Sequence, residues 1–137
     1  FLAQGTPFIN GGQEFMRTKR GNANSYMAPD IVNQIDISMK EKFSDVYNTY
    51  KALISFRKAN KTEFGANENA SAQIISPNVV KYVSGKFTVY FNSNSKPVSV
   101  SDSGKIIQIN EKDGTYSVGK SVSVSSVPEK SFVIIQK

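Results

Sequence analysis

The sequence of 137 residues contains no cysteine, no histidine and no tryptophan. Without cysteine there is neither a disulfide framework nor a thiolate nucleophile. Without histidine, a Ser-His-Asp triad and the usual zinc sites are excluded within this sequence. No apolar run approaches the length that spans a bilayer, so we expect no membrane partner. No calcium-loop motif is present, and we expect neither a metal nor a cofactor.

The formal net charge is +6, and the basic residues are spread over both halves of the sequence. A nucleic-acid-binding face needs clustered charge, so a basic nucleic-acid-binding β domain is the least favoured interpretation. The hydrophobic content of 39% permits a folded core. The sequence begins with Phe1 rather than Met, so we expect a processed chain or a fragment. Cytoplasmic and secreted or cell-surface locations both stay open.

Residues 38–61 carry the most regular pattern in the sequence. Ser38 and Glu41 have the spacing of a capping box, which marks a helix start. Behind them, residues that recur at three- and four-residue steps form one face: Phe43, Val46, Tyr47, Tyr50, Leu53, Ile54 and Arg57. This spacing predicts an amphipathic helix that ends near Ala59 and buries its apolar stripe against a core.

The period changes from 3.6 to 2 after a polar stretch near residues 65–70, which predicts a domain boundary between 1–65 and 66–137. Short strands are expected at 72–76, 79–83, 86–92, 97–101, 105–110, 114–118, 121–127 and 131–137. Ser103–Gly104 and Asp113–Gly114 are expected to form turns. This spacing of strands favours an antiparallel β-sandwich. The last strand is apolar on both faces, so we expect it to be central.

The stretch from Gly5 to Glu14 is predicted to be a strand at residues 6–10 that ends at Gly11 and Gly12. A long polar loop follows over residues 11–37. A strand whose carboxyl end opens into a polar loop is how α/β barrels build their sites. The plainer alternative is an ordinary strand followed by a solvated loop.

Gly5, Pro7, Gly12 and Glu14 resemble the signature around the last barrel strand of the α-amylase superfamily, glycoside hydrolase family 13. Residues 13–19, 24–26, 29–30 and 32–36 are similar, in the same order, to the pullulanase branch of that family. The resemblance implies an α+β fragment, in which the last strand and helix of a (β/α)8 barrel are followed by an antiparallel β-sandwich.

The resemblance also implies a function. The parent enzyme would hydrolyse α-1,6 linkages in pullulan, starch or glycogen with carboxylates on upstream strands, so no catalytic residue is expected here. The expected partners are the upstream remainder of the barrel and a branched α-glucan, and the chain alone is expected to be inactive. The alternative is a non-catalytic sugar-binding or structural β-sandwich module, whose aromatic residues would be Tyr82, Tyr90 and Tyr116.

By the same resemblance, the loop supplies substrate-binding residues. We expect Tyr26 and Asp30 first, then Asn24, Arg17 and Asn33. The alternative is that Asn24 and Asp30 cap turns and that Arg17 pairs with Glu14. Because one barrel strand and one helix cannot close a barrel, their apolar faces would lack partners. We therefore also expect self-association through this exposed barrel face.

Overall fold

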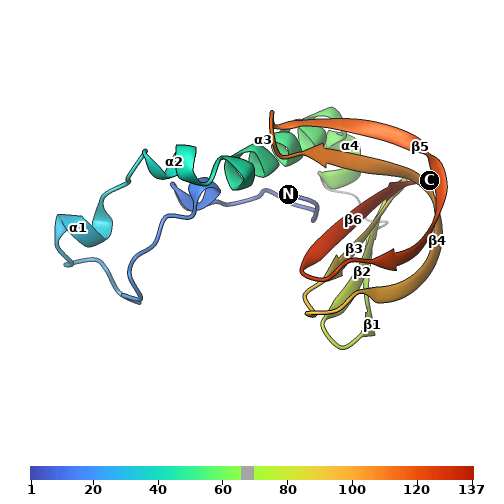
Figure 1. Ribbon diagram of the computed structural model, residues 1–137, viewed down its shortest axis with the longest axis horizontal. Helices are drawn as coiled ribbons and strands as arrows, with labels where there is room; N and C mark the ends of the chain where they lie inside the picture. The colour runs from blue at the N-terminus through green and yellow to red at the C-terminus, as the bar shows by residue number, and fades with distance from the viewer. Residues whose placement is uncertain (66–69) are drawn as a thin grey trace.

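The computed structural model describes residues 1–65 and 70–137. A region of short helices precedes a six-stranded sheet (Figure 1). The helices are η1 (Gln13–Phe15), α1 (Asp30–Asn33), α2 (Met39–Lys42), α3 (Ser44–Ala59) and α4 (Lys61–Phe64). The strands are β1 (Ser71–Ser76), β2 (Val79–Ser84), β3 (Phe87–Asn92), β4 (Val98–Asn110), β5 (Thr115–Val127) and β6 (Ser131–Gln136). Within the described ranges, no helix combines the length and the apolar character needed to cross a membrane.

The strands form one antiparallel sheet in the order β1-β2-β3-β6-β4-β5. β6 lies between β3 and β4, so the prediction of a central last strand is confirmed. Its neighbouring residues Ile134 and Ile135 point to opposite faces, and both are buried. The middle of the sheet is therefore covered on both sides.

One face of the central strands is covered by another part of the same sheet. β4 pairs with β5 along most of its length, but it pairs with β6 only at residues 105–107. Beyond that point the β4–β5 hairpin curls over the central strands (Figure 1). Val124 and Val127 of β5 consequently pack with Tyr90 and Ile135 in one buried cluster. The result is an antiparallel domain with the layered form of a sandwich, built from one continuous sheet.

The prediction of two short strands in place of each of β4 and β5 is wrong, as is the turn at Ser103–Gly104. Gly104 lies inside β4 and pairs with Val122. Its φ is +149°, and a Cβ there would lie 2.5 Å from the carbonyl oxygen of Gln136. Glycine therefore lets the strand pass close to β6 while it bends. Two register shifts in the β4–β5 ladder add to the bend without ending either strand.

The helix α3 covers the other face of the central strands. Phe56 is fully buried, and its ring lies 5.0 Å from the ring of Phe87 and 5.2 Å from that of Tyr116, measured between centroids. The predicted helix and its end at Ala59 are confirmed. The buried face differs from the predicted stripe, because Ala52 and Phe56 are buried while Ile54 is only half-buried.

The start of this helix also differs from the prediction, because the capping box at Ser38 does not form. The Ser38 hydroxyl instead donates to Oδ1 of Asp36 at 2.6 Å. Non-helical angles at Phe43 (φ −117°, ψ 44°) then separate α2 from α3. The single predicted helix is therefore two helices with a break between them.

Residues 6–42, here called the arm, extend away from the sheet and carry η1, α1 and α2 (Figure 1). The predicted strand at residues 6–10 does not form in this structure. Nothing in the described ranges pairs with this segment as a neighbouring strand, so its backbone is extended without a ladder. Phe8 is 97% exposed as a result. The division into domains 1–65 and 66–137 stays a prediction.

Candidate functional site

The loop that was predicted to contact substrate begins at a glycine turn. Gly12 has a φ of +90°, and a Cβ at this position would lie 2.8 Å from the side chain of Arg17. Glycine is required here both for the backbone angle and for the space. The Gly12 N–H donates to Oε2 of Glu14 at 3.0 Å. Glu14 therefore holds the turn that begins the loop, which is a structural contact.

Arg17 connects the two ends of the loop. One of its terminal nitrogens donates to the carbonyl oxygen of Gly11 at 3.1 Å, and the other donates to the carbonyl oxygen of Asn33. Its Nε is buried without a hydrogen-bond partner. The predicted alternative of an Arg17–Glu14 ion pair does not form, because each side chain binds a backbone group instead.

Asn33 and Lys19 meet inside the loop. Asn33 Nδ2 donates to the carbonyl oxygens of Ser25 at 2.8 Å and Ala28 at 2.9 Å. Asn33 Oδ1 accepts a hydrogen bond from Lys19 Nζ at 2.7 Å, and the same amine donates to Ser25 Oγ at 2.8 Å. Because Arg17 donates to the carbonyl oxygen of Asn33, two of the predicted site residues are in direct contact.

The other three predicted residues lie on the outer surface of the same loop. Tyr26 is 89% exposed, and Asn24 and Asp30 are also exposed. The turn at Asn24 is formed by Asn22, whose Oδ1 accepts the Asn24 N–H at 3.0 Å, so the Asn24 side chain does not cap it. Asp30 opens α1 without a side-chain cap. The loop therefore displays an aromatic ring, a carboxylate and an amide to solvent.

Asp36, near the end of the loop, stays ionised to a lower pH than an ordinary aspartate. The hydroxyl and the backbone N–H of Ser38 both donate to its Oδ1, at 2.6 and 3.0 Å. These hydrogen bonds favour the charged form and lower the pKa of Asp36. Asp36 also lines a hollow of about 160 Å³ together with Arg17, Ile31 and Met39.

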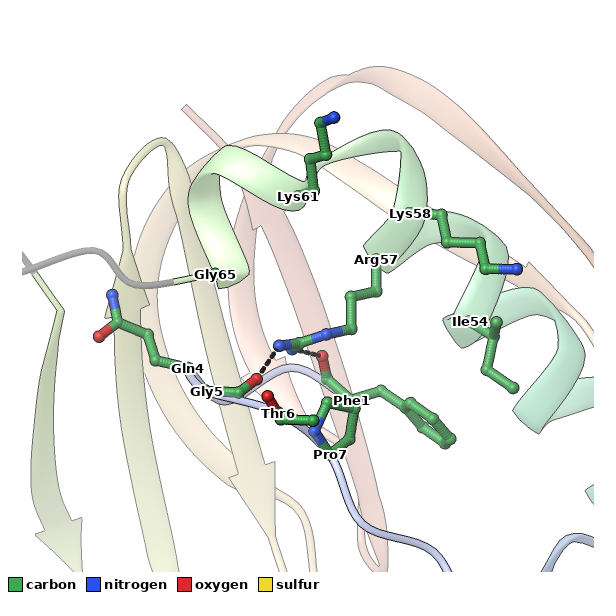
Figure 2. A pocket seen from close by; sticks show the side chains of 10 residues that line it. All are labelled: Phe1, Gln4, Gly5, Thr6, Pro7, Ile54, Arg57, Lys58, Lys61 and Gly65. Carbon is green, nitrogen blue, oxygen red and sulfur yellow. Dashed lines mark hydrogen bonds between the residues drawn. The ribbon is translucent and has the colours of Figure 1, made fainter.

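A second hollow lies where the arm meets α3. It is a groove of about 860 Å³ between residues 1–7 and the helix, lined by Phe1, Pro7 and Ile54 among others. Figure 2 shows the Arg57 guanidinium reaching from α3 to the carbonyl oxygens of Phe1 and Gly5. The groove does not include any of the predicted substrate-binding residues. Arg57 was expected on the apolar stripe of the helix, and nothing in the sequence signals that it binds backbone carbonyl groups.

The tyrosines of the alternative sugar-binding module do not form an exposed platform. Tyr90 is buried, and its hydroxyl donates to Asp102 Oδ2 at 2.9 Å. Tyr82 accepts the Gln4 N–H at 3.1 Å, and Tyr116 packs edge-on against Phe56. Each ring therefore has a structural contact. Over residues 1–65 and 70–137, no group of His, Cys, Asp or Glu is arranged to hold a metal ion.

The chain was compared with known proteins. No protein-family model matches it. Over 59 residues it is 51% identical to a pullulanase from Bacillus subtilis (strain 168), a match that covers 43% of this chain and 8% of the relative. An isoamylase from Pseudomonas amyloderamosa is 37% identical over 59 residues, with the same shares covered. The structure of pullulanase from Bacillus acidopullulyticus matches 99% of this chain and 19% of its own, with a TM-score of 0.75 and 29% identity.

The chain is therefore similar to proteins named pullulanase and isoamylase, and the resemblance seen in the sequence is confirmed. Of these, the sequence match at 51% identity and the structural match are to proteins named pullulanase. The chain spans only 8% of the length of the curated relatives and 19% of the solved structure. The similarity thus concerns one part of such an enzyme.

Proposed function

We propose that this chain is part of a debranching enzyme that hydrolyses α-1,6-glucosidic linkages in pullulan, starch or glycogen. One observation carries the proposal: the fold matches a pullulanase over 99% of the chain. A segment of 59 residues that is 51% identical to another pullulanase supports it. The catalytic carboxylates would lie in the part of the enzyme that this chain does not cover.

In this proposal, residues 1–65 supply the last strand, the following loop and the last helix of a (β/α)8 barrel, and residues 66–137 supply the trailing β domain. The exposed arm supports this assignment. Phe8 is 97% exposed beside a backbone that forms no ladder, and Ile37 is 72% exposed. In a closed barrel, a neighbouring strand would pair with residues 6–10, and the layer packed on that face of the sheet would cover Phe8.

The loop would then lie on the catalytic face of the barrel, where the loops after the strands build the site. Tyr26, Asp30 and Asn24 have exposed side chains that can reach a sugar, while Arg17 and Asn33 lie beneath them. A tyrosine ring offers a flat apolar face, and the polar side chains offer hydrogen-bond partners for hydroxyl groups. This combination suits an oligosaccharide better than a charged ligand.

The test is pullulan hydrolysis, first by this chain alone and then after the upstream part of a related pullulanase is added in trans. Activity only in the mixture supports the proposal. Tyr26→Ala in the mixture should raise KM, whereas Gln13→Ala, an exposed substitution at the start of η1, should not. Activity of the chain alone would overturn the account. Binding of branched maltodextrin with no activity in either case would favour the sugar-binding module.

A further inference from the structure

The most exposed large apolar side chains of the loop are displayed by one tight turn. The Ala28 N–H donates to the carbonyl oxygen of Ser25 at 3.0 Å, which closes a four-residue turn. Tyr26 and Met27 occupy the two central positions, and each is 89% exposed. Because both side chains project from the tip, their direction depends entirely on how firmly the turn is held.

A single side chain binds both ends of this turn. The two Nδ2 hydrogen bonds of Asn33 go to the carbonyl oxygens of Ser25 and Ala28, the first and last residues of the turn. The amide thus uses both of its N–H donors within the loop. Its Oδ1 is held in turn by Lys19 Nζ at 2.7 Å, which fixes the rotation of the amide.

Lys19 completes the arrangement from a third position in the chain. Its ammonium donates to Asn33 Oδ1 and, at 2.8 Å, to Ser25 Oγ. Both bonds are charge-assisted, and such bonds are stronger than bonds between neutral groups. Residues 19, 25, 28 and 33 are thereby joined into one hydrogen-bonded unit, which we call the clasp.

We infer that Lys19 and Asn33 are positioning residues, which hold the turn so that Tyr26 and Met27 face the substrate of the proposed debranching reaction. The inference rests on the proposed function for its substrate, but not for its geometry. The side-chain amide of Asn33 has no N–H left to donate to a sugar. Asn33 therefore affects substrate binding only by positioning Tyr26. A small misplacement of a residue that contacts the substrate lowers the reaction rate strongly. The clasp therefore matters to the reaction although it does not contact the substrate.

The geometry can be tested without any sugar. The chain contains no tryptophan, so Tyr26→Trp creates a single fluorophore at the tip of the turn. Time-resolved anisotropy at low concentration then separates nanosecond motion of Trp at position 26 from tumbling of the whole chain. In this background, Lys19→Met removes both donors, and Lys19→Arg keeps donors and charge. Gln13→Ala serves as the matched control, and far-UV circular dichroism verifies folding.

We expect Lys19→Met and Asn33→Ala each to raise the mobile fraction of the probe nearly threefold, as a fall in order parameter from about 0.85 to about 0.6 implies. Lys19→Arg and Gln13→Ala should leave it unchanged. Because the two residues act as one unit, the double variant should move the probe no more than either single variant. Equal anisotropy in Lys19→Met and Lys19→Arg, or fully additive effects, would overturn the inference. If Lys19→Met fails to fold, Ser25→Ala removes one Lys19 contact without a charge change and must show the same direction.

The reconstituted enzyme gives a second, separate readout. Lys19→Met should raise KM for pullulan about tenfold, equivalent to about 1.4 kcal/mol of binding, with a smaller effect on kcat. If the turn becomes mobile while KM is unchanged, the clasp does hold the turn, but Tyr26 does not contact the substrate. A rigid turn in Lys19→Met would reject the clasp whatever the enzyme does.

Discussion

The guanidinium of Arg57 donates a 2.6 Å hydrogen bond to the carbonyl oxygen of Phe64, seven residues further along the chain. The same group also binds the carbonyl oxygens of Phe1, Ala3 and Gly5. One side chain of α3 therefore joins the end of α4 to the N-terminal segment, whose Leu2 is buried in the core. A planar fork with five donors suits this task, and a single ammonium cannot reproduce it.

Replacing Arg57 by lysine should consequently destabilise the chain although the charge is kept. We expect the free energy of unfolding to fall by about 1–3 kcal/mol, because at least one partly buried carbonyl group loses its partner. Urea unfolding followed by circular dichroism measures the change. Lys58→Met, on the exposed side of the same turn, is the matched control and should change stability by less than about 0.5 kcal/mol. Equal stability of Arg57→Lys and the unmodified chain would show that these hydrogen bonds contribute nothing.

Gly104 should not tolerate a side chain. In Gly104→Ala the new Cβ would lie 2.5 Å from the Gln136 carbonyl oxygen and 2.6 Å from the side chain of Ile135, at a φ of +149°. We expect a loss of about 1–3 kcal/mol in the free energy of unfolding. Gly119→Ala is the comparison, because its Cβ would lie 3.1 Å from the nearest atom and its φ is ordinary. A result in which Gly119→Ala is the more damaging change would contradict the account of the β4 bend.

The turn between β4 and β5 carries a pH-dependent contribution to stability. The hydroxyl and the backbone N–H of Thr115 donate to Oδ1 of Asp113 at 2.7 and 2.9 Å, and they lower the pKa of Asp113 below its ordinary value of 3.8. Because the folded pKa lies below the unfolded one, the stabilisation is complete above the unfolded pKa. It is lost as the pH falls through the folded pKa.

Thr115→Val should therefore raise the pKa of Asp113 toward 3.8, without reaching it, because the backbone hydrogen bond persists. NMR titration of the carboxyl group measures the shift directly. Urea unfolding at neutral pH should show the variant less stable than the unmodified chain, and this difference should shrink in acid. Ser117→Ala, two residues along β5, should leave the titration of Asp113 unchanged. If the difference in stability grows in acid, ionised Asp113 does not stabilise the turn in the way described.

Elements that depend on neighbouring residues in the sequence were predicted, and elements that depend on contacts between distant residues were not. The α3 helix, the strands β2 and β3 and the central position of β6 follow from local apolar patterns, and they were predicted. The long β4 and β5 were not, because Gly104 next to Ser103 has the local signature of a turn. Its true role depends on β6 passing close by, and a single sequence does not show that contact.

The candidate site divides in the same way. Its location in the loop and the surface position of Tyr26 could be expected from the family resemblance. The contacts of the Asn33 side chain could not, because its partners are two backbone carbonyl groups and one amine, none of which leaves a sequence signal. The strand predicted at residues 6–10 does not form, because a strand needs a neighbour to pair with. No such partner is among the described residues.

The exposed arm leads to the last prediction, which concerns association. Phe8 and Ile37 are 97% and 72% exposed, and Ile31 and Ile35 on the same arm are each 50% exposed. Apolar surface of this kind marks an interaction site or a tendency to aggregate, so we expect the isolated chain to self-associate and to bind an apolar dye. Substituting Phe8→Ser with Ile37→Ser should weaken association about a hundredfold or more, since each buried large side chain contributes about 1.5–3 kcal/mol.

Light scattering during size-exclusion chromatography, over a range of concentrations, measures that association, and dye fluorescence reports the exposed surface. Val122→Ser is the matched control, because Val122 is an exposed apolar residue that belongs to β5 and not to the arm. It should leave both readouts unchanged. Adding the upstream part of a pullulanase should suppress association of the unmodified chain, because the same apolar residues would then be covered. A chain that stays monomeric at high concentration and binds no dye would show that the arm needs no cover, and the proposed barrel contact would lose its main physical support.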